Sequence, residues 1–143
     1  MTPPLAGDQA VMIIPTGGDP PADAVRAWTA GALVGMPLVP RMRAVLVVAE
    51  LVSNARRHGC LPCVLRLSLD PTRRHLLVFV EDAAPADDAV WPVGAGLSLV
   101  DGLTSDWAVE SRPRGKTVWA EIALGARVSG LAIPPQPPSD HEV

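Results

Sequence analysis

The sequence predicts an α+β domain, with helices packed on one face of a mixed, mainly antiparallel sheet. Apolar residues recur at helical spacing in two long segments, whereas shorter apolar or alternating segments are bounded by turns rich in Pro, Gly and Asp. The expected order is strand, helix, helix, two strands, helix and two strands. That order suits a two-layer sandwich of helices on a sheet.

The first expected strand is the short apolar run QAVMII at 9–14, which stops at the turn sequence PTGGDPP. The first helix is expected at 22–36, with Pro37 and Pro40 ending it. Its apolar positions at helical spacing are Val25, Trp28, Ala32 and Met36.

A second helix is expected from about Met42 to His58, closed by Gly59 as a C-terminal cap. The segment 64–70 alternates apolar and polar residues, and 75–82 is largely apolar. We expect these two segments to form an antiparallel hairpin around PTRR. The second of them should be a central strand.

The C-terminal part begins with a loop rich in Pro, Ala and Gly, followed by LSLVDGLTSD, which predicts a short helix. Two strands are then expected on either side of the turn RPRG. In the second of these strands, one face carries Val118, Ala120 and Ile122, and the other carries Thr117, Trp119 and Glu121.

Composition limits the classes of function. Of 143 residues, 48% are hydrophobic and 19% are charged, and no apolar run reaches the ~18 residues of a membrane span. A net charge of -3 argues against nonspecific binding to nucleic acid, and the N-terminal sequence lacks the features of a secretory signal, so we expect a cytoplasmic protein. We expect one domain at 9–125, between disordered tails at 1–8 and at the proline-rich 126–143.

Cys60 and Cys63 form the sequence CLPC, a spacing typical of a redox pair or of half a zinc site. There is no second cysteine pair, and His58 is the only histidine close to them in sequence. The other interpretation is two small buried hydrophobic residues between a helix and a strand.

The second expected helix carries three regularly spaced polar residues, called here the polar ladder. Glu50, Asn54 and His58 recur every four residues in a segment rich in Val, Leu and Ala, which places them on one helix face. One interpretation is a solvated face on which acid and amide hydrogen-bond each other. The other is a binding site.

Two further pieces of sequence favour a binding site. Asp82 follows an apolar strand, where a carboxylate can accept a hydrogen bond from an exocyclic amine such as that of adenine, although Asp is also common in turns. Gly94 and Gly96 precede a helix, where glycines let backbone N–H groups approach phosphates. An amide oxygen such as that of Asn54 is a ligand that Mg²⁺ takes beside phosphate oxygens. Together these residues predict a site for a magnesium nucleotide.

The motifs ELVSNARRHG, VEDAAP, GAGLSLVDGLTSDWAV and GKTVWAEI stand in the order and spacing of the GHKL ATPase superfamily. The chain resembles this superfamily over about residues 9–124. It is most similar to anti-sigma-factor serine/threonine kinases and to actinobacterial single-domain ATP-binding regulators. The resemblance implies a Bergerat-type α/β sandwich, with ATP and Mg²⁺ as cofactors.

The resemblance also implies roles for individual residues. Asn54 would bind Mg²⁺, and Glu50 would be the general base toward a serine hydroxyl or water. Asp82 would read adenine, with Thr117 supporting the base and its bound water beside that aspartate. The other nucleotide-binding positions implied are Arg57, His58, Ala84, Gly94, Gly96 and Leu97.

The chain departs from the superfamily pattern at the acid motif. Much of the superfamily has D-x-G-x-G there, whereas Asp82 is followed by Ala83, Ala84 and Pro85. Two functions therefore stay open. Glu50 favours a serine/threonine kinase that sequesters a sigma factor and phosphorylates a STAS-type antagonist. The missing glycines favour a catalytically silent module that regulates transcription by sequestering its partner.

Other interpretations agree less well with the sequence. The catalytic half of a histidine kinase needs a phospho-accepting histidine on a dimerisation helix, and none of the three histidines precedes the expected ATP domain. A homodimer through residues 22–40 fits the resemblance. No nucleic-acid or membrane partner is expected.

Overall fold

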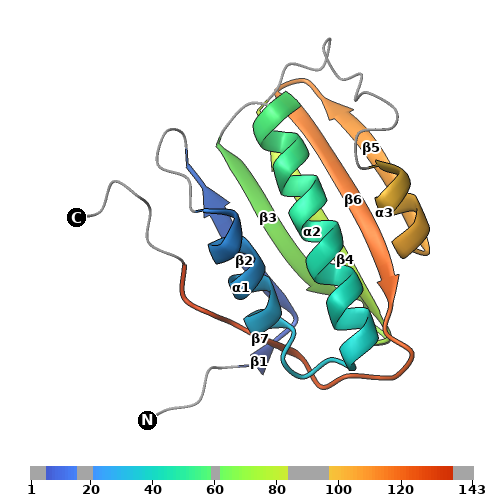
Figure 1. The fold of residues 1–143 in the computed structure, drawn as a ribbon. Helices are drawn as coiled ribbons and strands as arrows, with labels where there is room; N and C mark the ends of the chain where they lie inside the picture. The colour runs from blue at the N-terminus through green and yellow to red at the C-terminus, as the bar shows by residue number, and fades with distance from the viewer. Residues whose placement is uncertain (1–5, 16–20, 59–61, 84–96, 137–143) are drawn as a thin grey trace.

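The computed structural model describes residues 6–15, 21–58, 62–83 and 97–136 (Figure 1). Its elements are β1 (Ala6–Gly7), β2 (Gln9–Ile14), α1 (Ala22–Ala32), α2 (Leu38–His58), β3 (Cys63–Leu69), β4 (His75–Asp82), α3 (Leu97–Leu103), β5 (Asp106–Arg112), β6 (Gly115–Ala123) and β7 (Leu131–Ala132). Apart from the short β1 and β7, this is the predicted order. The predicted α+β class is confirmed.

Five strands form the main sheet, in the order β2-β3-β4-β6-β5. All pairings between these described strands are antiparallel, and β4 is central, as expected. At the end of β4, Asp82 pairs with Cys63 on β3 and with Lys116 on β6. The C-terminal end of β4 therefore lies beside the first residues of both neighbouring strands.

The three helices lie on one face of this sheet (Figure 1). Buried and half-buried residues alternate along β3 and β4, because successive side chains of a strand point to opposite faces. The buried set of β4 includes Leu76, Val78 and Val80, and α2 contacts both β4 and β6. The hydrophobic core therefore lies between the helices and the sheet.

The helices α1 and α2 differ from the prediction near the prolines. α1 ends at Ala32, earlier than expected, and α2 begins at Leu38, so Pro40 lies in the first turn of α2 instead of before it. A proline is tolerated there because the first N–H groups of a helix have no intrahelical acceptor. No helix in the described ranges combines the length and apolar character needed to cross a membrane.

Residues at both ends of the described chain belong to the fold. We expected disordered tails at 1–8 and 126–143, but β1 pairs with β7, and Val128 and Leu131 are buried in the core. Gln136 borders the sheet edge at Ile13, accepting from its N–H at 3.1 Å and donating to its carbonyl oxygen at 2.6 Å. The expected domain boundaries were too narrow because two-residue strands leave no periodic pattern in the sequence.

Candidate functional site

The helix α2 places two members of the predicted ladder above the sheet. Asn54 is fully buried on the same side of the helix as Leu51 and Ala55, and Glu50 is half-buried one turn earlier. Oδ1 of Asn54 accepts a hydrogen bond from Nη2 of Arg57 at 2.9 Å. Nδ2 of Asn54 is buried and has no hydrogen-bond partner in the part of the chain that the structure describes. Because an unsatisfied buried donor is costly, this amide calls for a partner that the described residues do not supply.

The strand β4 brings Asp82 to the helix-covered face of the sheet. Its carboxylate Oδ2 lies 2.9 Å from Nζ of Lys116, and both side chains are only 1% exposed. The two residues are register partners on adjacent strands, so their side chains leave the sheet on the same side. Each charge stabilises the other, because opposite charges at this distance attract strongly in the protein interior.

The side chains of Thr117 and Asp82 leave the sheet on opposite faces, whereas the resemblance implied that Thr117 supports the base beside Asp82. The register partners of Thr117 are Glu81 on β4 and Glu110 on β5, which places it on the opposite face of the sheet. Its hydroxyl oxygen is buried without a hydrogen-bond partner among the described residues. Lys116, the register partner of Asp82, occupies the position next to this carboxylate.

Gly115 allows β6 to begin tightly against the end of β4. Its φ is +155°, and a Cβ atom at this position would overlap the carbonyl oxygen of Asp82. Glycine is therefore required for this close approach. The approach in turn sets the following residue, Lys116, beside the Asp82 carboxylate.

A cavity of about 210 Å³ lies at these strand ends. It is lined by Glu81, Asp82, Arg112, Arg114, Gly115, Lys116 and Thr117. Glu81 also forms ion pairs with Arg66 at 3.0 Å and with Arg112 at 3.9 Å. The lining is thus dominated by charged side chains of both signs, which suits a polar ligand.

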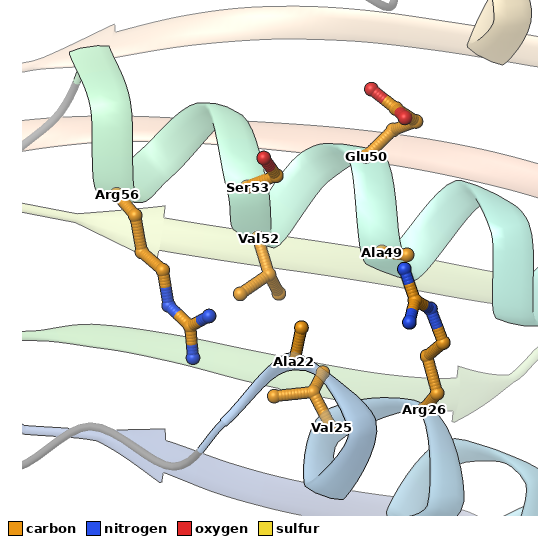
Figure 2. Close-up of a pocket in the computed structure, with 8 residues that line it drawn as sticks. All are labelled: Ala22, Val25, Arg26, Ala49, Glu50, Val52, Ser53 and Arg56. Atoms are coloured by element: carbon orange, nitrogen blue, oxygen red, sulfur yellow. The ribbon is translucent and has the colours of Figure 1, made fainter.

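A smaller cavity of about 140 Å³ separates α1 from α2 (Figure 2). Val25 from α1 and Val52 from α2 lie on its two sides. Glu50 also lines it, but its carboxylate lies on the side of α2 away from α1 (Figure 2). Arg26, which reaches from α1, pairs with Asp23 at 3.1 Å. The Glu50 carboxylate is therefore directed away from the nearest cationic group of α1.

Several predicted site residues fall outside the described part of the chain. Ala84, Gly94 and Gly96 lie outside it, and so does Cys60. His58 is the last residue of α2 and Leu97 is the first of α3, but their side chains are not described. Cys63 is buried at the start of β3. Within the described ranges, no group of three or more His, Cys, Asp or Glu side chains could hold a metal ion.

Reasoning from the sequence missed Lys116, although two signals pointed to it. The alternation along β6 that turns Val118 inward also turns residue 116 inward. Lys116 is also the only lysine among the 143 residues, and the other 11 basic residues counted as Lys or Arg are all arginines.

Comparison with known proteins finds similarity only in three dimensions, since no protein-family model and no curated protein matches the chain. The chain is similar to the crystal structure of the RsbU and RsbW domains of Rv1364c from Mycobacterium tuberculosis. The identity is 21% and the TM-score 0.57, over 80% of this chain and 30% of that one. It is also similar to the histidine kinase domain of a blue-light activated histidine kinase from Erythrobacter litoralis EL346, with 28% identity and a TM-score of 0.48 over 64% of this chain and 50% of that one.

The chain spans half or less of the length of each of these two proteins. The similarity to the mycobacterial structure shows the fold, in agreement with the order and layers described above. The α/β sandwich predicted from the sequence is therefore confirmed as the fold of this chain.

Proposed function

We propose that the chain is an ATP-binding regulatory protein of the GHKL type that acts in the cytoplasm as a serine/threonine kinase. One observation carries this proposal: Asn54 is fully buried, and no described residue satisfies its Nδ2. It lies at the same end of the sandwich as Asp82, because α2 ends at His58, shortly before β3 begins opposite Asp82. An amide and a carboxylate on neighbouring elements suit a ligand with metal-bound phosphates at one end and a purine at the other.

The residues present fit magnesium and phosphate. Asn54 would hold Mg²⁺ through Oδ1, in exchange for its hydrogen bond from Arg57, and its buried Nδ2 would donate to a phosphate oxygen. The released guanidinium of Arg57 could then donate to phosphate oxygens. When bound, Mg-ATP would supply the phosphoryl group for transfer.

The base end of the proposed site is already engaged within the protein. Oδ2 of Asp82 accepts from Lys116, so an adenine amine has to share this carboxylate with the ammonium group. Sharing is chemically feasible, because an ionised carboxylate offers about four lone-pair positions to donors.

Glu50 is proposed as the general base. It lies one turn before Asn54 on α2, and its half-buried carboxylate is directed away from α1 (Figure 2). Its carboxylate would accept the proton of a serine hydroxyl as the hydroxyl oxygen attacks the γ-phosphorus of ATP, while the bond from that phosphorus to the bridging oxygen breaks and ADP leaves.

The partners in this proposal follow from the resemblance of the motifs. They are a sigma factor that the chain would hold inactive, and a STAS-type anti-anti-sigma protein that carries the target serine. The fold supports this assignment through its similarity to a structure that contains an RsbW domain. A homodimer through residues 22–40 belongs to the same proposal.

Two contacts favour a second function, a catalytically silent module that regulates transcription by sequestering its partner. Lys116 engages the carboxylate of Asp82, and Arg57 engages the amide oxygen of Asn54. Both groups proposed to bind nucleotide are thus paired within the protein. A module of this kind would act only by binding its partner, without transferring phosphate.

Titration of ATP with and without Mg²⁺, followed by incubation with γ-labelled ATP and candidate STAS partners, separates the two functions. The kinase requires Mg²⁺-dependent binding and transfer of label to a serine of the partner. Nucleotide binding without transfer, or no binding even at millimolar ATP, would leave the silent module.

A further inference from the structure

The ion pair between Lys116 and Asp82 changes what this end of the site can recognise. A carboxylate by itself is only an acceptor and matches a base that presents an exocyclic amine. Here the carboxylate is joined to an ammonium group at 2.9 Å, and the two side chains are equally buried. The subsite therefore presents N–H donors next to carboxylate acceptors.

We propose that Lys116 sets the base selectivity of the nucleotide site and removes the preference for adenine that Asp82 alone would give. This inference rests on the proposed function, because it assumes that the base lies against Asp82. Adenine and hypoxanthine differ at position 6 of the purine, where adenine carries an amine donor and hypoxanthine a carbonyl acceptor. Asp82 favours the amine, whereas the ammonium group of Lys116 favours the carbonyl.

Burial of the pair affects the affinity for every purine in the same way. Because the two side chains are only 1% exposed, a base that contacts them has to displace the groups that cover them. The cost of this displacement is shared by all purines, so it lowers affinity without altering the choice of base. The ratio of the affinities for ATP and ITP is consequently the quantity that measures the effect of Lys116.

The test compares ATP with ITP, the hypoxanthine nucleotide, by calorimetric titration in Mg²⁺. We expect the wild-type protein to bind ITP at least as tightly as ATP. In Lys116→Thr, whose short side chain suits a strand, the Asp82 carboxylate loses its ion pair with Lys116, and ATP should be preferred by about 10-fold or more. Lys116→Arg keeps the positive charge and should retain the wild-type ratio.

The wild-type protein offers a second measurement, which does not depend on the folding of a variant. Because Lys116 is the only lysine, ¹⁵N-labelled lysine gives a single side-chain ammonium signal that needs no assignment. Saturation with ITP should shift this signal, because the base carbonyl becomes a new acceptor for Nζ. An unchanged ammonium signal in nucleotide-saturated protein overturns the proposal.

The outcomes distinguish this inference from the proposed function. Mg²⁺-dependent binding with a clear ATP preference in the wild type, or with the same ratio in wild type and a folded Lys116→Thr, overturns the role of Lys116 and leaves nucleotide binding intact. ATP binding by Lys116→Thr but no nucleotide binding by the wild type overturns both the selectivity proposed for Lys116 and nucleotide binding by the natural chain. If neither protein binds a nucleotide, both proposals fail.

Discussion

Arg57 and Asn54 lie one turn apart on α2, and Nη2 of Arg57 donates to Oδ1 of Asn54 at 2.9 Å. The oxygen proposed to bind Mg²⁺ is therefore already satisfied by a cation. An incoming metal ion has to replace the guanidinium, which then needs an anionic partner of its own. Metal and triphosphate should consequently bind together, and Mg²⁺ alone should bind poorly.

The variant Asn54→Ala should lose the Mg²⁺ dependence of ATP binding. In the wild type we expect Mg²⁺ to raise ATP affinity by about 10-fold or more, because the amide oxygen ties the metal-bound phosphates to α2. Titration of ATP with and without Mg²⁺ measures this effect. Ser53→Ala, at a half-buried position next to it, is the matched control and should behave as the wild type. Equal Mg²⁺ dependence in Asn54→Ala and wild type would remove Asn54 from the site.

The variant Gly115→Ala should destabilise the fold at the proposed base end. The added Cβ overlaps the carbonyl oxygen of Asp82, so β6 has to shift away from β4, at a cost of about 1–3 kcal/mol. Gly102→Ala in α3 is the opposite control, because in the described part of the chain no atom outside its chain neighbours and its own helix backbone lies within 4 Å of the added Cβ. Since alanine favours a helix more than glycine, this change should stabilise by about 0.5–1 kcal/mol. Denaturant unfolding measures both, and a stable Gly115→Ala would contradict the close approach.

The segment after β6 should contribute to stability. Leu131 is fully buried in β7, and truncation to alanine should lower the free energy of unfolding by about 2–5 kcal/mol. Ile133, two residues further on, is 45% exposed, and its truncation should cost less than about 1 kcal/mol. Equal and small effects at both positions would show that the domain ends near residue 125, as the sequence had suggested.

Hydrogen bonds to Asp70, in the turn between β3 and β4, should make the stability of the fold depend on pH. Asp70 accepts hydrogen bonds from the Thr72 hydroxyl and from the N–H groups of His75 and Arg74, and these hold its pKa well below the usual range. The ionised carboxylate therefore stabilises the fold above the ordinary aspartate pKa, and this contribution is lost as the pH falls below about 4. Asp70→Asn should be less stable than the wild type at neutral pH, with a difference that shrinks in acid. Denaturation at several pH values measures it, and a difference independent of pH would contradict the argument.

Much of the fold could be predicted because its elements carry strong periodic patterns. The hairpin of β3 and β4 and the inward face of β6 follow from alternation, which reflects the pleat of a strand. The predicted start of α2 at Met42 is too late, because a proline in the first turn of a helix breaks no hydrogen bond and Pro40 therefore lies inside α2. Strands of two residues, such as β7, have no period to detect.

The candidate site was predicted less completely, because its key contacts join distant parts of the chain. The spacing of Glu50 and Asn54 is a local property of one helix and could be read directly. The contact between Asp82 and Lys116 depends on the register of β4 against β6, which the sequence motifs alone did not determine. Thr117 and Lys116 are successive residues of β6, so their side chains point to opposite faces of the sheet. A register that differs by one residue would therefore place Thr117 instead of Lys116 opposite Asp82.

The variant Glu50→Gln should separate phosphoryl transfer from binding. A general base acts only in the transition state, so its loss should lower transfer of the γ-phosphate by about 10²–10⁴-fold while nucleotide and partner binding stay nearly unchanged. Glutamine keeps the size of the side chain but cannot accept the serine proton.

The control is Glu110→Gln, at an exposed position on β5, which should transfer phosphate as the wild type does. Transfer is measured with γ-labelled ATP and STAS partners, beside titrations of ATP and of the sigma factor. Normal transfer by Glu50→Gln would exclude Glu50 as the general base. Tight ATP binding by a wild type that labels no partner would show that the protein acts by binding its partner, without transferring phosphate.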